Sequence, residues 1–165
     1  DMMHKTDGGG VVVNINSNSD VDKAWQRLNT VAKKLPKKFS YSFHAQQQIE
    51  NGLELIAGVK YDGSFGNVLM FGAGGILAEL IGDSNLSTLP LDTDKTVELI
   101  ANSKAYKLLK GYRGHTPYAI QKLAELLVKL GNIAQASSYF SELTINPIIV
   151  TDKEAWAVDP RIILR

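Results

Sequence analysis

The chain has 165 residues and a formal net charge of +1, with 44% hydrophobic and 21% charged residues. This length suits one sizeable domain, and the charge gives no reason to expect a nucleic acid or an anionic membrane as partner. Because there is no cysteine, disulfides and thiolate sites are excluded, and no apolar run reaches the ~20 residues that a membrane span needs. We therefore expect one domain over residues 1–165. The missing cysteine does not fix the compartment, but nothing in the sequence argues for secretion, and a cytoplasmic location is expected.

The first third of the chain predicts a strand followed by a helix. A β-branched run over residues 11–15 is typical of a strand. Apolar residues then recur at helical spacing over residues 19–35, and Ser19 with Asp22 predicts a capping box at the start of the helix. Trp25 lies on the apolar stripe of this helix and is expected in the core.

The middle of the chain predicts hairpins and a glycine loop. Residues 43–60 read as two strands around a turn at residues 50–52, because Asn-Gly is a strong hairpin signal. A short buried strand is predicted over residues 67–71. Glycines at 72, 74 and 75 then lead into a predicted helix over residues 76–81, an arrangement that favours anions at a helix N-terminus.

The next segment predicts a strand over residues 86–91 and two helices. Asp92 is expected to cap the first, which runs to Ile100. Thr116 as cap and Pro117 at the first helical position are expected to open the second. Its apolar stripe predicts core packing for Ile120, Leu123, Ala124, Leu127, Leu130, Ile133 and Ala134. The alternation of strands with three main helices indicates an α+β or α/β fold.

Residues 141–165 predict a β-hairpin, with strands over 143–150 and 155–163 joined by the polar residues 151–154. In that register Val150 faces Ala155 and Asn146 faces Asp159. Opposed residues on one face have Cβ atoms roughly 5 Å apart, so an amide oxygen and a carboxylate would converge. Such oxygens suit Mg²⁺, which keeps several waters and usually binds substrate phosphates as well.

A solvated polar pair is the alternative interpretation of these two residues. Strand parity puts Thr144 on the same face as Asn146. The reverse face is expected to anchor the hairpin through Ile145, Pro147, Ile149, Trp156 and Val158.

Several segments resemble, in order, the ATP-grasp domain of ADP-forming (NDP-forming) acyl-CoA synthetases, relatives of the succinyl-CoA synthetase beta subunit. Residues 4–11 resemble that family's His-Lys-Ser-Asp-x-Gly-Gly-Val signature, residues 70–76 its Met-Phe-Gly-x-Gly-Gly-Ile segment, and residues 108–114 its Leu-Leu-x-Gly-Tyr-Arg-Gly segment. The terminal hairpin is similar to its metal-binding hairpin. The resemblance implies an ATP-grasp fold of mixed sheets flanked by helices, with the nucleotide between two α+β lobes.

The resemblance also implies the site residues. His4 would accept a phosphoryl group from a partner subunit and pass it to ADP, which suits a side chain whose pKa lies near neutrality. Considered alone, a histidine near a chain end is more often a solvated bystander. Asn146 and Asp159 would hold the Mg²⁺ that accompanies ATP or ADP.

A hinge over residues 46–49 would receive the adenine edge through main-chain groups, and Arg113 would either bind a phosphate or form a structural salt bridge. The nucleotide-binding residues expected on this basis are Lys5, Gln46, Gln47, Gln48, Ile49, Glu54 and Arg113.

The chain departs from the family pattern at two positions. Thr144 stands where the family usually has an acid, and Gln47 also replaces a carboxylate. The opening strands of an ATP-grasp domain, one of which carries a phosphate-binding lysine, have no counterpart in the sequence, so we expect its larger C-terminal portion.

The function that the resemblance implies is nucleotide binding and phosphoryl transfer in a synthetase that converts acyl-CoA, ADP and phosphate to acid, CoA and ATP. The portion alone is expected to be inactive, and the CoA-binding domain or subunit of the same synthetase would be its partner in a homo- or hetero-oligomer. The alternative is a non-catalytic or regulatory module of a protein lysine acetyltransferase, which the two lost carboxylates would suit.

Overall fold

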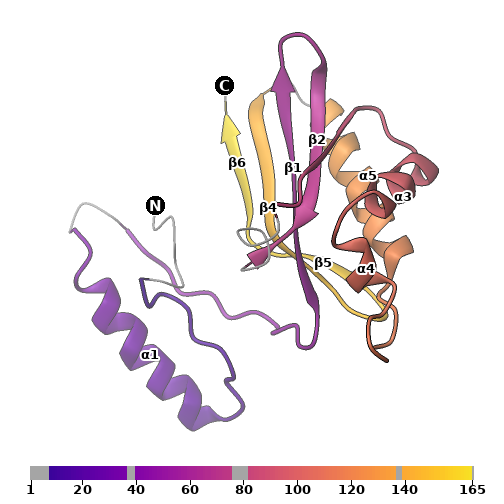
Figure 1. Cartoon of the computed structure of the whole chain (residues 1–165). Helices are drawn as coiled ribbons and strands as arrows, with labels where there is room; N and C mark the ends of the chain where they lie inside the picture. Colours follow the sequence, from indigo (N-terminus) through magenta and orange to yellow (C-terminus); the bar gives the residue numbers. More distant parts are fainter. Residues whose placement is uncertain (1–7, 37–39, 76–81, 137–138, 165) are drawn as a thin grey trace. The chain divides into compact units, whose positions relative to one another are not determined.

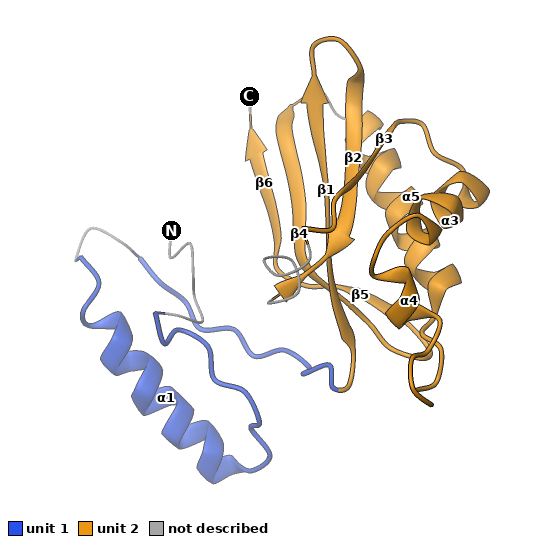
Figure 2. Cartoon of the chain, viewed as in Figure 1, with its two compact units in different colours: residues 1–50 blue, residues 51–165 orange. Residues whose placement is uncertain are grey.

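The structure is a computed structural model that describes residues 8–36, 40–75, 82–136 and 139–164. His4, Lys5 and the helix predicted over residues 76–81 lie outside the described residues. The chain divides into two compact units, Asp1–Glu50 and Asn51–Arg165, coloured separately in Figure 2. The boundary directly follows the predicted hinge at residues 46–49. A single domain over the whole chain stays a prediction.

In its described residues the first unit contains one helix, α1 (Asn18–Ala32), which begins after Ser17. The backbone of Ser17 is extended, with φ −146° and ψ 162°, so its hydroxyl can accept from the backbone N–H of Asp20 at 3.2 Å. The same hydroxyl donates to Asp20 Oδ2 at 2.8 Å. The predicted capping box of Ser19 and Asp22 is therefore wrong by two residues, because the capping side chain belongs to the residue that precedes the helical turn.

Three other predictions for the first unit are also wrong. Residues 11–15 and 43–49 form no strand in the described part of the chain, since a strand requires a paired neighbour and β-branched residues alone do not supply one. Trp25 is 57% exposed, and the buried residues of α1 are Ala24 and Ala32. The Trp25 ring instead meets Phe43 edge to face, with centroids 5.0 Å apart.

The cap of α1 predicts a pH effect. The hydroxyl of Ser17 and the backbone N–H of Asn16 lower the pKa of the Asp20 carboxyl below its ordinary 3.8. Because the folded-state pKa is depressed, this stabilisation is present above pH 3.8 and is lost as the pH falls through the folded pKa. We expect Ser17→Ala to return the Asp20 pKa toward its ordinary value in an NMR titration of the carboxyl carbon. Ser19→Ala is the control, and an equal change in both variants would contradict the cap.

The second unit is built on a six-stranded sheet of order β3-β2-β1-β4-β5, with β6 also paired to β4 (Figure 1). Every pair described in it is antiparallel. β5 and β6 lie on successive stretches of the same edge of β4. The strands are β1 (Leu53–Asp62), β2 (Gly66–Ala73), β3 (Asn85–Thr88), β4 (Phe140–Val150), β5 (Ala155–Ala157) and β6 (Pro160–Leu164).

Three helices, α3 (Thr93–Ala101), α4 (Tyr106–Leu109) and α5 (Ile120–Ala136), lie beside one face of this sheet (Figure 1). The core forms between that face and α5, where Leu55, Leu69, Phe71, Leu123 and Leu127 are almost wholly inaccessible. The prediction that Ile133 also packs in this core is wrong, because the residue is 56% exposed. The resulting α+β architecture confirms the predicted class.

Of the two helix starts predicted in this unit, the start of α3 is confirmed and the start of α5 is wrong. α3 begins after Asp92 as predicted, since Asp92 Oδ1 accepts from the backbone N–H of Lys95 at 2.8 Å. α5 begins at Ile120 and not at Pro117. The N–H groups of Tyr118 and Ala119 donate instead to the carbonyls of Leu109 and Thr151, at 2.9 and 2.8 Å. These tertiary bonds keep the segment before Ile120 out of the helix.

The predicted strand at residues 67–71 is confirmed within β2, and the strand predicted over 86–91 ends at Thr88. The loop between β1 and β2 is closed by Asp62, whose Oδ1 accepts from the N–H groups of Ser64 and Phe65 at 2.8 and 3.0 Å. None of the helices in the described ranges has the length and apolar character needed to span a membrane.

Candidate functional site

The sheet face that does not pack against α5 carries the candidate site, and we call it the open face. On β1 the buried residues Leu55, Ala57 and Val59 alternate with exposed Glu54 and Lys60. Side chains that alternate with the core therefore share the open face.

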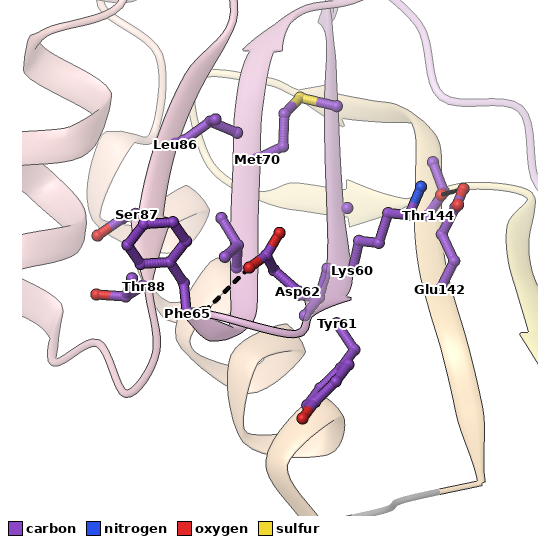
Figure 3. A pocket seen from close by; sticks show the side chains of 13 residues that line it. Lys60, Tyr61, Asp62, Phe65, Met70, Leu86, Ser87, Thr88, Glu142 and Thr144 are labelled. Atoms are coloured by element: carbon purple, nitrogen blue, oxygen red, sulfur yellow. Dashed lines mark hydrogen bonds between the residues drawn. The ribbon is translucent and has the colours of Figure 1, made fainter.

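A hollow of about 690 Å³ lies on the open face beside the β1–β2 turn (Figure 3). Its floor is largely apolar, and charged side chains enter it from β1 and β4. Residues that line the hollow include Lys60, Asp62, Met70, Leu86, Glu142 and Thr144.

A bulge in β4 shapes the open face next to this hollow. The register between β1 and β4 shifts by one residue between Leu55 and Ala57, so that Asn146 and Pro147 both oppose Ile56. The residues of β4 on either side of this pair are buried, whereas Asn146 is exposed and Pro147 is half-buried. Both bulge residues therefore lie on the open face.

Beyond the bulge, the residues of β4 point to the sheet faces opposite to those predicted from the sequence. Ile145 is buried as expected, but Ile148 and Val150 are then fully buried while Ile149 is only partly so. Trp156, the cross-strand partner of Ile149, is 42% exposed. The prediction that Ile149 and Trp156 anchor the hairpin is therefore wrong, because one extra residue changes the strand parity.

The register of the terminal hairpin is confirmed where strands pair. Val150 pairs with Ala155 and Ile148 with Ala157, and the loop closes through a bond from the N–H of Thr151 to the carbonyl of Glu154, at 2.8 Å. The predicted second strand is in fact two strands, β5 and β6, and Asp159 interrupts them with a left-handed φ of 51°.

Asp159 lies in the break between β5 and β6, and Asn146 lies opposite it on β4. The register that pairs Ile148 with Ala157 resumes unchanged where Ile145 pairs with Pro160. Within that register Asn146 and Asp159 occupy opposed positions, and both are exposed. The N–H of Val158 donates to the carbonyl of Pro147 at 3.0 Å, which ties the two sides together within the break.

The donor chemistry of this pair fits Mg²⁺. An amide oxygen and a carboxylate are hard ligands, and Mg²⁺ often takes only one or two carboxylates when it also binds phosphates. Among the residues that the structure describes, no three His, Cys, Asp or Glu side chains cluster as a metal site. A dedicated all-protein cage is therefore absent from the described ranges, and the pair suits an ion that arrives with a nucleotide.

Glu54 lies against the glycine loop that follows β2. Its backbone carbonyl accepts from the N–H of Gly74 at 3.0 Å. A Cβ built on Gly75, whose φ is +54°, would come within 2.6 Å of Glu54 Oε2. The glycine thus allows the carboxylate to approach the loop, and the structure brings together two features that the sequence had linked to the nucleotide.

The predicted hinge has irregular backbone within the first unit. Gln46 and Gln47 are exposed, and Ile49 is half-buried. The amide of Gln48 is engaged elsewhere, because its Oε1 accepts from the N–H of Asn14 at 2.7 Å and its Nε2 donates to Asn14 Oδ1 at 2.9 Å. Any adenine contact of Gln48 would therefore use its main chain, as the prediction assumed.

Arg113 lies in the turn after α4, with a left-handed φ of 52°. Its guanidinium sits 5.3 Å from the ring centroid of Tyr112, a cation–π contact within its own turn. This contact neither joins Arg113 to the bulge of β4 nor supplies the salt bridge considered from the sequence.

Lys60 and Glu142 were missed as site candidates. They are Cα partners on β1 and β4, and both line the hollow. The signal for Glu142 was available, because it precedes Thr144 by two positions and a strand has a period of two. Lys60 ends the range that reads as two strands, and its local pattern gives no sign of a site.

The chain matches the model of a family described as the ATP-grasp domain over residues 1–164. It is 34% identical over 164 residues to acetate–CoA ligase (ADP-forming) I subunit beta of Pyrococcus furiosus, a match that covers 99% of this chain and 71% of the subunit. It is also 34% identical over 164 residues to acetate–CoA ligase (ADP-forming) II of Archaeoglobus fulgidus. The chain spans only 23% of the length of that ligase.

Solved structures of the dinucleotide-forming acetyl-coenzyme A synthetase 1 of Candidatus Korarchaeum cryptofilum are also similar. One, in complex with coenzyme A, Ca-AMPCP and HgCl⁺, is 36% identical with a TM-score of 0.90, over 99% of this chain and 72% of that one. Another contains coenzyme A and Mg-AMPPCP, and its phosphohistidine segment points towards the nucleotide binding site. It is 34% identical with a TM-score of 0.86, over 100% of this chain and 72% of that one.

Proposed function

Since the chain belongs to the ATP-grasp domain family of ADP-forming acyl-CoA ligases, as its motifs predicted, we propose that it is the nucleotide-binding and phosphoryl-transfer portion of such an enzyme. The whole protein would convert acyl-CoA, ADP and phosphate to acid, CoA and ATP, reversibly, through a phosphohistidine. This chain would contribute the nucleotide site and the histidine.

The observation that carries this proposal is the placement of Asn146 on the open face by the bulge of β4, opposite Asp159 in the hairpin register. These two side chains would hold Mg²⁺, which supplies charge to offset the crowded phosphate oxygens. Glu54, next to the glycine loop, and the main chain of residues 46–49 would position the nucleotide, with Lys5 and Arg113 as further phosphate contacts.

His4 would carry the phosphoryl group. Its neutral imidazole nitrogen would form a bond to phosphorus as the bond from phosphorus to the histidine of the partner subunit breaks. The new nitrogen–phosphorus bond would then break as the terminal oxygen of ADP takes the group. The acyl-CoA site would lie on the CoA-binding domain or subunit of the same synthetase, in a homo- or hetero-oligomer. We infer a cytoplasmic location from the same family membership.

The second candidate function is a regulatory module of a protein lysine acetyltransferase. Two observations favour it: Thr144 and Gln47 both stand where the family usually has a carboxylate. A module of this kind would bind acyl-CoA or nucleotide without forming a phosphohistidine.

Phosphorylation of the complete protein separates these functions. Incubation with γ-labelled ATP and Mg²⁺ is expected to give a label that is acid-labile and base-stable, as a phosphohistidine requires. His4→Gln should remove the label, whereas His115→Gln, at an exposed histidine before α5, should retain it. No label on the wild type, together with tight acyl-CoA binding in calorimetry, would contradict the enzyme and support the regulatory module.

A further inference from the structure

The sheet face that carries α3, α4 and α5 becomes less covered from β1 toward β6. The core residues of β1 are at most 1% exposed, whereas Phe140 and Leu143 on β4 are 9% and 4% exposed. Their Cα partners on β6, Leu164 and Ile162, are 71% and 55% exposed. Because directly opposed residues share one face of a sheet, these two β6 side chains lie on the face that carries the core. Apolar side chains of β6 are thus left uncovered on this helix side of the sheet.

The widths of helices and strands explain why β6 is left uncovered. A helix with its side chains is ~10 Å wide and neighbouring strands are ~4.8 Å apart, so one helix covers about two strands. α3 packs on β2 and β3, and α5 packs on β1, β2, β4 and β5. β6 lies beyond β4, at the edge of the sheet farthest from β3 (Figure 1). One further helix beside α5 would complete this layer.

α5 also turns an apolar side chain toward that edge. A Cβ built on Gly131 would lie 2.9 Å from Cδ2 of Leu89, in the segment between β3 and α3, so Gly131 marks the α3 side of the helix. Ile133 follows two residues later and is rotated by about 200° around the helix axis. Since α3 lies on the β3 side of α5, the opposite flank, with the exposed Ile133, faces the β6 edge.

We propose that an amphipathic helix of the same polypeptide, from outside residues 1–165, packs on this uncovered surface, which we call the β6 strip. The strip consists of Ile133, Pro160, Ile162 and Leu164. A five-residue strand is ~17 Å long, so a helix of about 11 residues, or three turns, would cover it. The inference rests on the part of the proposed function that makes this chain a portion of a longer protein.

Two observations favour the same polypeptide over a second copy of the chain. The match to the Pyrococcus furiosus subunit covers 99% of this chain but 71% of the subunit, and the remainder of such a protein is long enough for a helix of this size. A stable interface between two proteins buries about 800 Å² on each partner, and the four partly exposed aliphatic side chains of the β6 strip supply only a fraction of that area.

Cysteine labelling of the complete protein tests whether the β6 strip is covered. Residues 1–165 contain no cysteine, so an introduced one can be identified by its labelled peptide in mass spectrometry. We expect a maleimide to label Ile162→Cys and Leu164→Cys about tenfold or more slowly than control variants, because a covered thiol reacts only when its cover opens. The controls are Asp152→Cys in the exposed β4–β5 loop and Glu98→Cys on the exposed side of α3.

A photoreactive benzophenone side chain at position 164 identifies what covers the strip. The expected product is a crosslink within one polypeptide, to a segment outside residues 1–165. A crosslink to a second copy, to a separate subunit or to another part of residues 1–165 would overturn the proposal. Protection of Ile162→Cys that disappears on about 100-fold dilution would also overturn it, because a helix of the same polypeptide is not diluted away.

This test can fail separately from the proposed function. Labelling of Ile162→Cys and Leu164→Cys as fast as the two controls would rule out the helix, while a phosphohistidine on His4 would still support the nucleotide site. A slow reaction at both positions, together with the intramolecular crosslink but no phosphohistidine, would leave the helix in place and contradict the enzyme. In guanidinium chloride all four cysteines should react at one rate, which confirms that the difference comes from the fold.

Discussion

Replacing Asp159 with alanine is expected to weaken binding of Mg²⁺·AMPPCP to the complete protein by about 100-fold or more. Loss of an outer-shell partner alone costs roughly 10- to 100-fold in metal affinity, and Asp159 would be a direct ligand. It is also the charged member of the pair, so its removal leaves only the neutral amide of Asn146 at the break between β5 and β6. Isothermal titration calorimetry at fixed Mg²⁺ measures the effect.

The same hairpin offers matched comparisons for Asp159→Ala. Asn146→Ala removes an uncharged donor, and we expect a smaller loss of about tenfold. Asp152→Ala removes a carboxylate from the exposed loop between β4 and β5 and should leave the affinity unchanged. Equal losses in Asp152→Ala and Asp159→Ala would mean that only the overall charge of the hairpin matters, and the metal assignment would then be wrong.

Gly72→Ala is expected to destabilise the second unit by about 3 kcal/mol or more, at the upper end of the range for overpacking. A Cβ at position 72 would overlap the carbonyl oxygen of Asp83 and lie 2.9 Å from its carbonyl carbon. Relief would require the backbone before β3 to move. The free energy of unfolding from urea titration, followed by fluorescence, measures the loss.

Asp83 is anchored, which is why the backbone before β3 cannot shift easily. The residue is 7% exposed, and its two carboxylate oxygens accept from the N–H groups of Lys104 and Ala105 at 3.0 and 2.9 Å. The control is Gly63→Ala in the β1–β2 turn, where nothing lies within 4 Å of a built Cβ. That change should stay within about 0.5 kcal/mol. Similar unfolding midpoints for the two variants would contradict the clash.

Local patterns in the sequence were sufficient for several elements of the second unit. The start of α3 at Asp92 depends on a side chain three residues from the N–H that it caps, and the register from Val150 to Ala155 depends on a four-residue loop. Both interactions are short in sequence, so residue type and spacing determine them.

The predictions that failed depend on partners far away in the chain. The start of α5 at Ile120 follows from bonds to Leu109 and Thr151, which compete with the Thr-Pro signal at residue 116. The bulge at Asn146 exists only relative to β1, which lies almost the length of the second unit earlier. A strand over residues 11–15 likewise needs a neighbour that the local sequence cannot provide.

In the candidate site, too, some residues could be predicted from the sequence, whereas others depend on contacts between distant parts of the chain. The resemblance to a family predicted roles for Asn146, Asp159 and Glu54, because motif positions can be compared without knowledge of the fold. It passed over Lys60 and Glu142, which line the hollow together because β1 and β4 pair at these positions.

The extra residue in β4 makes the two halves of that strand depend on residue count as well as residue identity. Deleting Asn146 or Pro147 would restore regular pairing with β1, so that Thr144 would stay on the open face and Ile148 and Val150 would stay in the core. A deletion several residues away from the bulge would instead turn the residues in between to the opposite face. The effect of a deletion at the bulge would be local, because a single residue in place of Asn146 and Pro147 would then oppose Ile56 on the open face. Among working relatives, a one-residue change in the length of β4 should consequently be tolerated at the bulge far better than elsewhere in the strand.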